Sequence, residues 1–158
     1  MTRLSRTARI LLIDDNANDV ELTLDAFSEV HLANHLEVAR SGREALERLF
    51  DQTRRPDGGR HPLPDLILLD LKMPGIDGFE VLRQVKAAPR LRRIPVVILT
   101  SSREQGDRAM SYDSGANSYL VKPVSFDGML EIVRTIAGYW LTINVGSPPL
   151  DDHGEEPA

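Results

Sequence analysis

Hydrophobic residues follow two patterns along this chain, and the two alternate from one end to the other. One pattern is the short apolar run typical of a buried strand, and the other is a recurrence every three or four residues, typical of one helix face. Five runs predict strands, and three of them are continuously apolar, as expected for strands covered on both faces. The runs span residues 10–13, 36–38, 66–69, 96–99 and 119–121.

Five helices are predicted between and after these strands. Ser41, followed by Glu44 three residues later, predicts a capping box at the start of the second helix. Regular alternation of strands and helices implies an α/β fold, a doubly wound parallel sheet with right-handed crossovers and helices on both faces. The residues expected to face the core are, helix by helix, Ala17, Val20, Leu24 and Phe27; Ala45, Leu46 and Leu49; Ile76, Phe79 and Leu82; Ala109 and Met110; and Phe126, Met129, Leu130, Val133, Ile136, Ala137 and Trp140.

Polar residues stand where four of the predicted strands end. Asp14 and Asp15 follow the first strand, and Asp70 follows the third. Thr100 comes directly after the fourth run, and Lys122 directly after the fifth. In an open parallel sheet, ligands bind beyond the carboxyl ends of the strands, so we expect these side chains to converge on one site. A single Asp after a strand often only caps a helix, but agreement between four strand ends favours a functional cluster.

The residue types in this cluster suit phosphoryl transfer. Three clustered carboxylates repel one another unless a cation neutralises them. Mg2+ is a hard cation that binds carboxylates and phosphoryl oxygens together. Asp70 would then be the nucleophile, since carboxylates can form aspartyl phosphates. Lys122 offers a positive charge, and Thr100 a hydroxyl, to further phosphoryl oxygens.

Composition excludes several other kinds of site. The chain has 158 residues, which suits one domain, and no cysteine, which excludes disulfides and zinc–thiolate sites. A formal net charge of −5 disfavours nucleic acid as a partner. The apolar runs are far shorter than the roughly 20 residues that span a bilayer, and the basic start lacks the apolar core of a signal peptide. We therefore expect a cytoplasmic location and no membrane partner. Along the chain we expect a flexible segment at 1–8, one domain at 9–141, and an extension with an acidic tail at 142–158.

Five motifs resemble the receiver domains of two-component response regulators. The resemblance covers roughly Arg9 to Leu141, and its motifs are Ile13–Asp15, Leu69–Gly78, Leu99–Ser101, Ser114–Asn117 and Tyr119–Pro123. It implies a flavodoxin-like sheet with strand order 2-1-3-4-5. It also implies a signalling phosphoacceptor rather than an enzyme, which receives its phosphoryl group from a partner sensor histidine kinase.

The resemblance assigns roles to individual positions. It implies that Lys122–Pro123 is a cis peptide bond, a form rare outside X–Pro. The implied roles are Asp70 as phosphoacceptor; Asp14 and Asp15 as the acidic pair that holds Mg2+, with the backbone carbonyl of Lys72; Thr100 as the switch hydroxyl; Tyr119 as the switch aromatic residue; and Lys122 as the conserved-type lysine of the motif.

A finer resemblance points to one group within this family. Residues 12–19, the long loop at 53–64 and the extension after the fifth helix are similar to stand-alone regulators partnered with bacterial phytochrome kinases. Because the fifth helix is predicted to end near Leu141, we expect no output domain, and the signal would leave through the receiver's own surface. Its destination stays open between a target protein, a phosphotransfer protein and the kinase itself.

Two other kinds of protein were weighed against this interpretation. Haloacid-dehalogenase-type enzymes also phosphorylate an Asp after a strand, but they need a second carboxylate two residues later as general acid, where this chain has Lys72. A dinucleotide-binding module needs a glycine-rich turn after the first strand, where this chain has Asp14-Asp15-Asn16-Ala17. Both fit poorly.

The C-terminal part of the chain predicts a homodimer. Leu141, Ile143 and Val145 alternate with polar residues, as in a half-buried extended segment, and Ile132 lies off the main apolar face of the fifth helix. Such apolar surface usually marks an interface, and a symmetric pair is the commonest arrangement. The alternative is that the segment folds back over the edge of its own sheet.

Overall fold

The computed structural model of the protein describes residues 8–30, 34–51 and 62–138. Five parallel strands, in the order β2-β1-β3-β4-β5, confirm the predicted doubly wound sheet. The strands are β1 (Ala8–Ile13), β2 (Asn34–Ala39), β3 (Leu66–Leu69), β4 (Val96–Thr100) and β5 (Ser118–Val121). The helices are α1 (Ala17–Ser28), α2 (Gly42–Leu49), α3 (Gly78–Ala87), α4 (Gln105–Asp113) and α5 (Phe126–Ile136).

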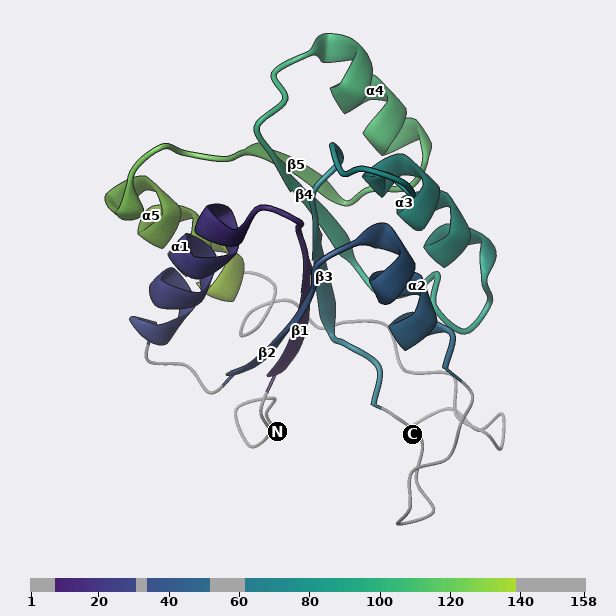
Figure 1. The fold of residues 1–158 in the computed structure, drawn as a ribbon, viewed down its shortest axis with the longest axis horizontal. Coiled ribbons are helices and arrows are strands. Elements are labelled where there is room, and N and C mark those ends of the chain that lie inside the picture. The colour runs from purple at the N-terminus through teal and green to yellow at the C-terminus, as the bar shows by residue number, and fades with distance from the viewer. Residues whose placement is uncertain (1–7, 31–33, 52–61, 139–158) are drawn as a thin grey trace.

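The sheet lies between two helical layers. Figure 1 shows α1 and α5 on one side of the strands and α2 and α3 on the other. In the central strand β3, Leu66 and Leu68 join the hydrophobic cluster with α1 and α5, while Ile67 and Leu69 join the cluster with α2 and α3. Successive strand residues point to opposite faces, so a strand covered on both faces must be apolar throughout.

Four of the five described helices begin at a residue whose side chain caps the helix. Asn16, Ser41, Asp77 and Ser125 each accept a hydrogen bond from the backbone N–H three residues later, at 2.9–3.0 Å. For Ser41 this donor is Glu44, as the capping box predicted. These caps fix the points at which the chain leaves the sheet edge and turns into a helix.

The expected core faces of two helices need correction. Ala17 and Leu24 on α1 are exposed, and Thr23 and Ala26 are buried there instead. On α4, Ala109 and Met110 are exposed, and the buried residues are polar: Asp107 and Ser111. The inner face of α4 is polar because it contacts the segment after β4 by a hydrogen bond: Ser102 Oγ donates to Asp107 Oδ2 at 2.6 Å.

The expected cis bond at Lys122–Pro123 is also absent, since no cis peptide bond occurs among the described residues. For X–Pro bonds the two isomers differ by only about 0.5–1 kcal/mol, so local sequence does not decide between them. Trp140, the extension at 142–158 and most of the expected loop at 53–64 lie outside the described residues. Among the helices that are described, none is long and apolar enough to cross a membrane.

Candidate functional site

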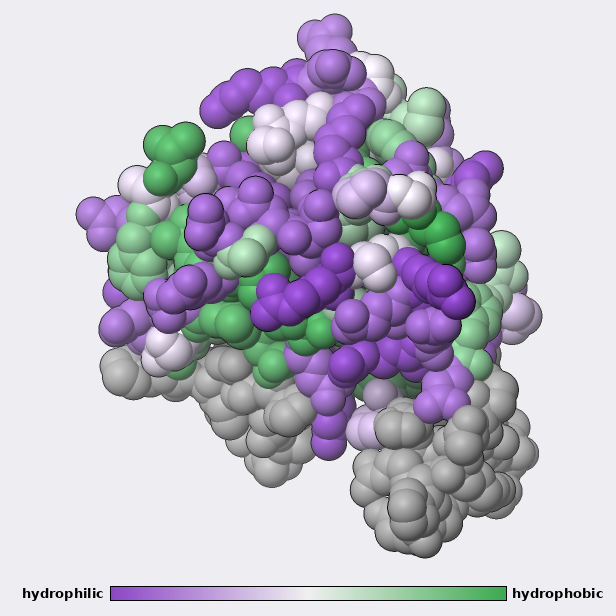
Figure 2. All heavy atoms as spheres, in the orientation of Figure 1, coloured by the Kyte–Doolittle hydropathy of each residue, from purple (hydrophilic) through white to green (hydrophobic). Residues whose placement is uncertain are grey.

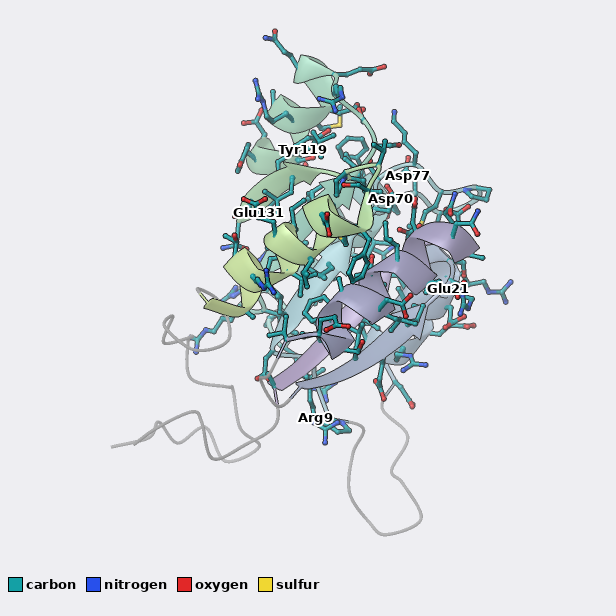
Figure 3. The ribbon with its side chains drawn as sticks, turned by 90° about the vertical axis from the view of Figure 1, so that its left-hand side faces the viewer. Arg9, Glu21, Asp70, Asp77, Tyr119 and Glu131 are labelled. Carbon is teal, nitrogen blue, oxygen red and sulfur yellow. The ribbon has the colours of Figure 1, made fainter. Side chains whose placement is uncertain are left out.

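The residues predicted at strand ends lie at one edge of the sheet, and Thr100 is the last residue of β4. Beyond β1, β3 and β5 the parallel hydrogen bonding continues for one residue: Asp14 N–H donates to Ala39 O, Asp70 N–H to Ile13 O, and Lys122 N–H to Thr100 O, at 2.7–3.0 Å. The backbone of these residues is therefore part of the rigid sheet rather than of a loop. Figure 3 shows Asp70 at this edge, at the opposite end of the sheet from Arg9.

Three carboxylates meet at this edge. One oxygen from each of Asp14, Asp15 and Asp70 lies within 4.8 Å of the others. Asp14 and Asp70 are buried, with 2% and 5% of their surface exposed, whereas Asp15 is exposed. Within the described part of the chain, Oδ1 of Asp70 is buried and has no hydrogen-bond partner. A buried, unsatisfied carboxylate oxygen is costly, and a bound cation would satisfy it, so this donor set fits Mg2+.

The Lys122 ammonium lies among carboxylates from three different segments. Its Nζ is 2.8 Å from Asp14 Oδ2, 2.9 Å from Asp19 Oδ2 and 3.1 Å from Asp70 Oδ2. An ammonium has three N–H donors, so these contacts use all of them. Burial acts to lower the pKa of Lys122, but the hydrogen bonds to Asp14 and Asp19 outweigh it, and the pKa is raised. Lys122 is therefore charged throughout the physiological pH range.

The pKa of Asp14 is shifted by the same environment. Burial raises its pKa, although the hydrogen bonds from Lys122 and from the Asn16 N–H act against that increase. The result is a site in which negative charge exceeds positive charge and in which added positive charge is favourable.

Thr100 and Tyr119 both contact Ser102 in the segment after β4. Thr100 is fully buried, and its Oγ1 accepts a hydrogen bond from the Ser102 N–H at 3.3 Å. Tyr119 is partly buried, and its hydroxyl donates to the Ser102 carbonyl at 3.0 Å. The two residues predicted to form a switch are therefore linked through one backbone segment.

Lys72 and α4 are joined at the same side of the site. Lys72 Nζ lies 3.2 Å from Asp107 Oδ2, and this oxygen also accepts from Ser102 Oγ at 2.6 Å. The hydrogen bond from Ser102 and, after it, that from Lys72 lower the pKa of Asp107, although burial acts to raise it. The side chain of Lys72 thus points to α4, while its backbone follows Asp70 by two residues.

The sequence reasoning missed Asp19 and Asp107. Asp19 sits in the first turn of α1, where an acidic residue ordinarily complements the helix dipole. Asp107 sits in the first turn of α4, a helix with no marked apolar face. The available signal was position: both acids lie in the first turn of a helix that starts at the sheet edge carrying Asp70.

Comparison with known proteins agrees with this geometry. The model of the response regulator receiver domain family matches residues 10–134. The probable methanogenesis regulatory protein FilR2 of Methanothrix harundinacea is 41% identical over 140 residues, 89% of this chain and 88% of that protein. The response regulator Rcp1 of Synechocystis is 36% identical over 132 residues, 84% of this chain and 88% of that protein.

Solved structures show the same fold. The phosphorylated cyanobacterial phytochrome response regulator RcpA has a TM-score of 0.80 and 35% identity, over 89% of this chain and 99% of that one. The Mn2+-bound form of Rcp1 has a TM-score of 0.79 and 34% identity over the same shares of the two chains. With a family model over most of its length and these relatives, the chain belongs to the response regulator receiver domain family and is similar to the phytochrome response regulators within it.

Proposed function

We propose that this protein is a response regulator that accepts a phosphoryl group on Asp70 from a partner sensor histidine kinase, with Mg2+ as the required cofactor. The observation that carries the proposal is the buried Asp70 carboxylate. Its Oδ1 has no hydrogen-bond partner among the described residues, while carboxylate oxygens of Asp14 and Asp15 lie near it and Lys122 Nζ lies 3.1 Å from its Oδ2. A carboxylate held in this way is placed to act as a nucleophile.

The metal would be held by side-chain oxygens of Asp14, Asp15 and Asp70, with the backbone carbonyl of Lys72 as the fourth protein ligand. When bound there, Mg2+ would screen the negative charge of the phosphoryl oxygens. The fit rests on hard oxygen donors that carry excess negative charge. It is also consistent with the Mn2+-bound structure of the related regulator Rcp1.

In the transfer step, an Asp70 oxygen forms a bond to phosphorus while the P–N bond of the kinase's phosphohistidine breaks. The electron pair of that bond stays on the imidazole of the donor. Lys122 is placed to hydrogen-bond a phosphoryl oxygen in exchange for Asp70 Oδ2, since its Nζ lies 3.1 Å from that oxygen. Thr100 would donate its hydroxyl to another phosphoryl oxygen.

Phosphorylation would then act on Thr100 and Tyr119 as a two-state element. A Thr100 hydroxyl drawn toward the phosphoryl group weakens its contact with the Ser102 N–H, and the same segment holds the Tyr119 hydroxyl. The phosphoryl group thus biases the position of the segment before α4 and of the Tyr119 ring. In this proposal, Thr100→Ala makes partner affinity insensitive to phosphorylation.

The phosphoacceptor is tested with acetyl phosphate and intact-mass measurement at neutral pH. We expect one added phosphoryl group, which requires Mg2+ and is lost in Asp70→Asn. Asp15→Ala should weaken Mg2+ binding and slow labelling without moving the modified residue. Asp113→Asn, an exposed acid at the end of α4, is the control and should be labelled as the wild type is. Normal labelling of Asp70→Asn would contradict the proposal.

The partner kinase is proposed to be a bacteriophytochrome. Support comes from the similarity to RcpA, a phytochrome response regulator. The absence of cysteine fits the cytoplasmic location that belongs to the same proposal. Phosphotransfer from a purified bacteriophytochrome kinase should be at least as fast as from an unrelated histidine kinase at equal concentration, and the reverse order would contradict this part.

We further propose a homodimer formed through α5 and the extension at 142–158, with residues 9–141 acting as the receiver unit. Phe126, Leu130 and Ile132 on α5 are only partly buried although they are hydrophobic, and Val124 just before them is fully exposed. Figure 2 shows apolar side chains gathered on the side of the molecule formed by α1 and α5. Such a surface favours association with a second copy.

A further inference from the structure

The carboxylates that surround Lys122 differ in what else they can bind. Asp14 and Asp70 belong to the three-carboxylate group that, among the described residues, has ligand atoms close enough to share a metal. Asp19 does not belong to that group, yet its Oδ2 is as close to Lys122 Nζ, at 2.9 Å, as that of the other two. One of the three partners of Lys122 is therefore independent of the proposed metal site.

Side chains of two neighbouring residues hydrogen-bond the backbone of Asp19, one at its N–H and one at its carbonyl. The Asp19 N–H donates to Oδ1 of the cap residue Asn16 at 2.9 Å. Its carbonyl accepts from the hydroxyl of Thr23 at 2.8 Å, and Thr23 is buried. The side chain of Asp19 is one-third exposed, so its carboxylate approaches Lys122 from the solvent side of the site. A carboxylate on so well-fixed a backbone can act as a stationary anchor.

The chemistry of the proposed reaction changes the other two contacts. When Asp70 becomes an acyl phosphate, it loses the full negative charge that attracts Lys122. When Asp14 binds a cation, its oxygens are shared between that cation and the ammonium. Asp19 alone keeps an unshared charge. The N–H group of Lys122 that bonded Asp70 is then released toward a phosphoryl oxygen, while another still binds Asp19.

We propose that Asp19 is a positioning residue that anchors the Lys122 ammonium beside Asp70 while Asp14 and Asp70 are engaged with the cation and the phosphoryl group. This inference rests on the proposed phosphoacceptor function. The simpler role for Asp19, a favourable charge at a helix N-terminus, accounts for its place in the first turn but not for its contact with Lys122.

The test measures the initial rate of labelling by acetyl phosphate at saturating Mg2+. Asp19→Asn should lower this rate by about ten-fold, the size of effect expected when a hydrogen bond to a charged group is lost. Its Mg2+ affinity should change less than that of Asp15→Ala. Asp25→Asn, an exposed acid on the same helix, is the matched control and should keep the wild-type rate. Asp19→Glu should restore part of the rate, because it keeps the charge.

A double-mutant cycle separates positioning from a merely structural effect. If Asp19 acts through Lys122, Asp19→Asn should have no further effect on the rate in a Lys122→Ala background. Thermal unfolding checks that each variant is folded. An equal loss in both backgrounds, or a wild-type rate in Asp19→Asn, would overturn this inference while leaving the phosphoacceptor proposal intact. Labelling of Asp70→Asn would instead overturn the function on which the inference rests.

Discussion

At the scale of single residues, the surroundings of Asp14 and Asp107 shift the pKa values of these two acids in opposite directions. Burial dominates at Asp14 and raises its pKa, whereas hydrogen bonds dominate at Asp107 and lower its pKa. Asp14 shares one lysine with two other carboxylates, while Asp107 receives Ser102 Oγ and Lys72 Nζ on a single oxygen. The first arrangement favours added positive charge, and the second is already satisfied. Asp107 is thus an acid whose charge is already paired, beside the group formed by Asp14, Asp15 and Asp70.

Asp107 should contribute to stability in a pH-dependent way. Because its pKa is lower in the folded state than the ordinary 3.8, its contribution is complete above the unfolded pKa and is lost as pH falls through the folded value. Asp107→Asn should therefore reduce the free energy of unfolding by about 1–2 kcal/mol at pH 7 and by less at pH 3, which lies below the unfolded pKa. Urea unfolding at both pH values measures the two differences.

The control for this experiment is Asp113→Asn, an exposed acid at the other end of the same helix. The raised pKa of Asp14 is common to the wild type and both variants, so it cancels in the comparison. A difference between wild type and Asp107→Asn that stays constant from pH 7 to pH 3 would show that the carboxylate charge does not act as we describe.

At the scale of elements, α3 begins directly against the backbone of the site. A Cβ at Gly78 would lie 2.2 Å from the Asp70 carbonyl oxygen and 2.6 Å from Leu71 Cα. The Gly78 N–H donates to the Leu71 carbonyl at 3.0 Å, which fixes this close approach. The helix thereby braces the segment that carries Asp70, and only glycine allows the contact.

Gly78→Ala should therefore destabilise the protein and disturb the segment after β3. We expect a loss of about 2 kcal/mol in the free energy of unfolding, since the obstacles are backbone atoms that cannot move aside cheaply. Gly106→Ala on α4 is the matched control: its Cβ would meet no atom of the described residues within 4 Å, and alanine in a helix should be neutral or slightly stabilising. Urea midpoints for the two variants decide the matter, and equal shifts would rule out the bracing role.

At the scale of the whole molecule, the side of the sheet covered by α1 and α5 keeps some hydrophobic surface exposed. Four hydrophobic residues of α1 and α5 that pack on the core from their side remain partly exposed: Leu22, Phe126, Leu130 and Ile132. In Figure 3, α1 and α5 lie side by side in front of the sheet, with Glu21 and Glu131 at their surfaces. This side carries both the anchor Asp19 and the proposed dimer surface, so association and phosphorylation would involve neighbouring elements.

Sedimentation velocity tests the dimer. The intact protein should sediment as a dimer at micromolar concentration, and a chain ending at Gly138 should be a folded monomer, because it keeps the described core and loses the extension. Circular dichroism verifies that the shortened chain is folded. A monomeric intact protein, with and without phosphorylation, would refute the proposed interface.

Much of the fold and part of the site follow from the sequence for a topological reason. A parallel sheet gathers the carboxyl ends of its strands at one edge, so the spacing of apolar runs was enough to bring Asp14, Asp70, Thr100 and Lys122 together in prediction. The same runs predicted β3 at the residues where it occurs, because a strand buried on both faces has no polar position.

Only the tertiary structure decided what the helices contribute. Asp19 and Asp107 reach the site because α1 and α4 pack on the sheet with these first-turn positions facing inward. The rotation of a helix about its own axis decides which positions face inward, and helical spacing alone does not fix that rotation when the apolar stripe is weak. The same freedom explains why Leu24 and Met110 are exposed where a hydrophobic face was expected. Strand ends are ordered by the sheet's own hydrogen bonds, whereas helix rotation is set by packing between elements far apart in the chain.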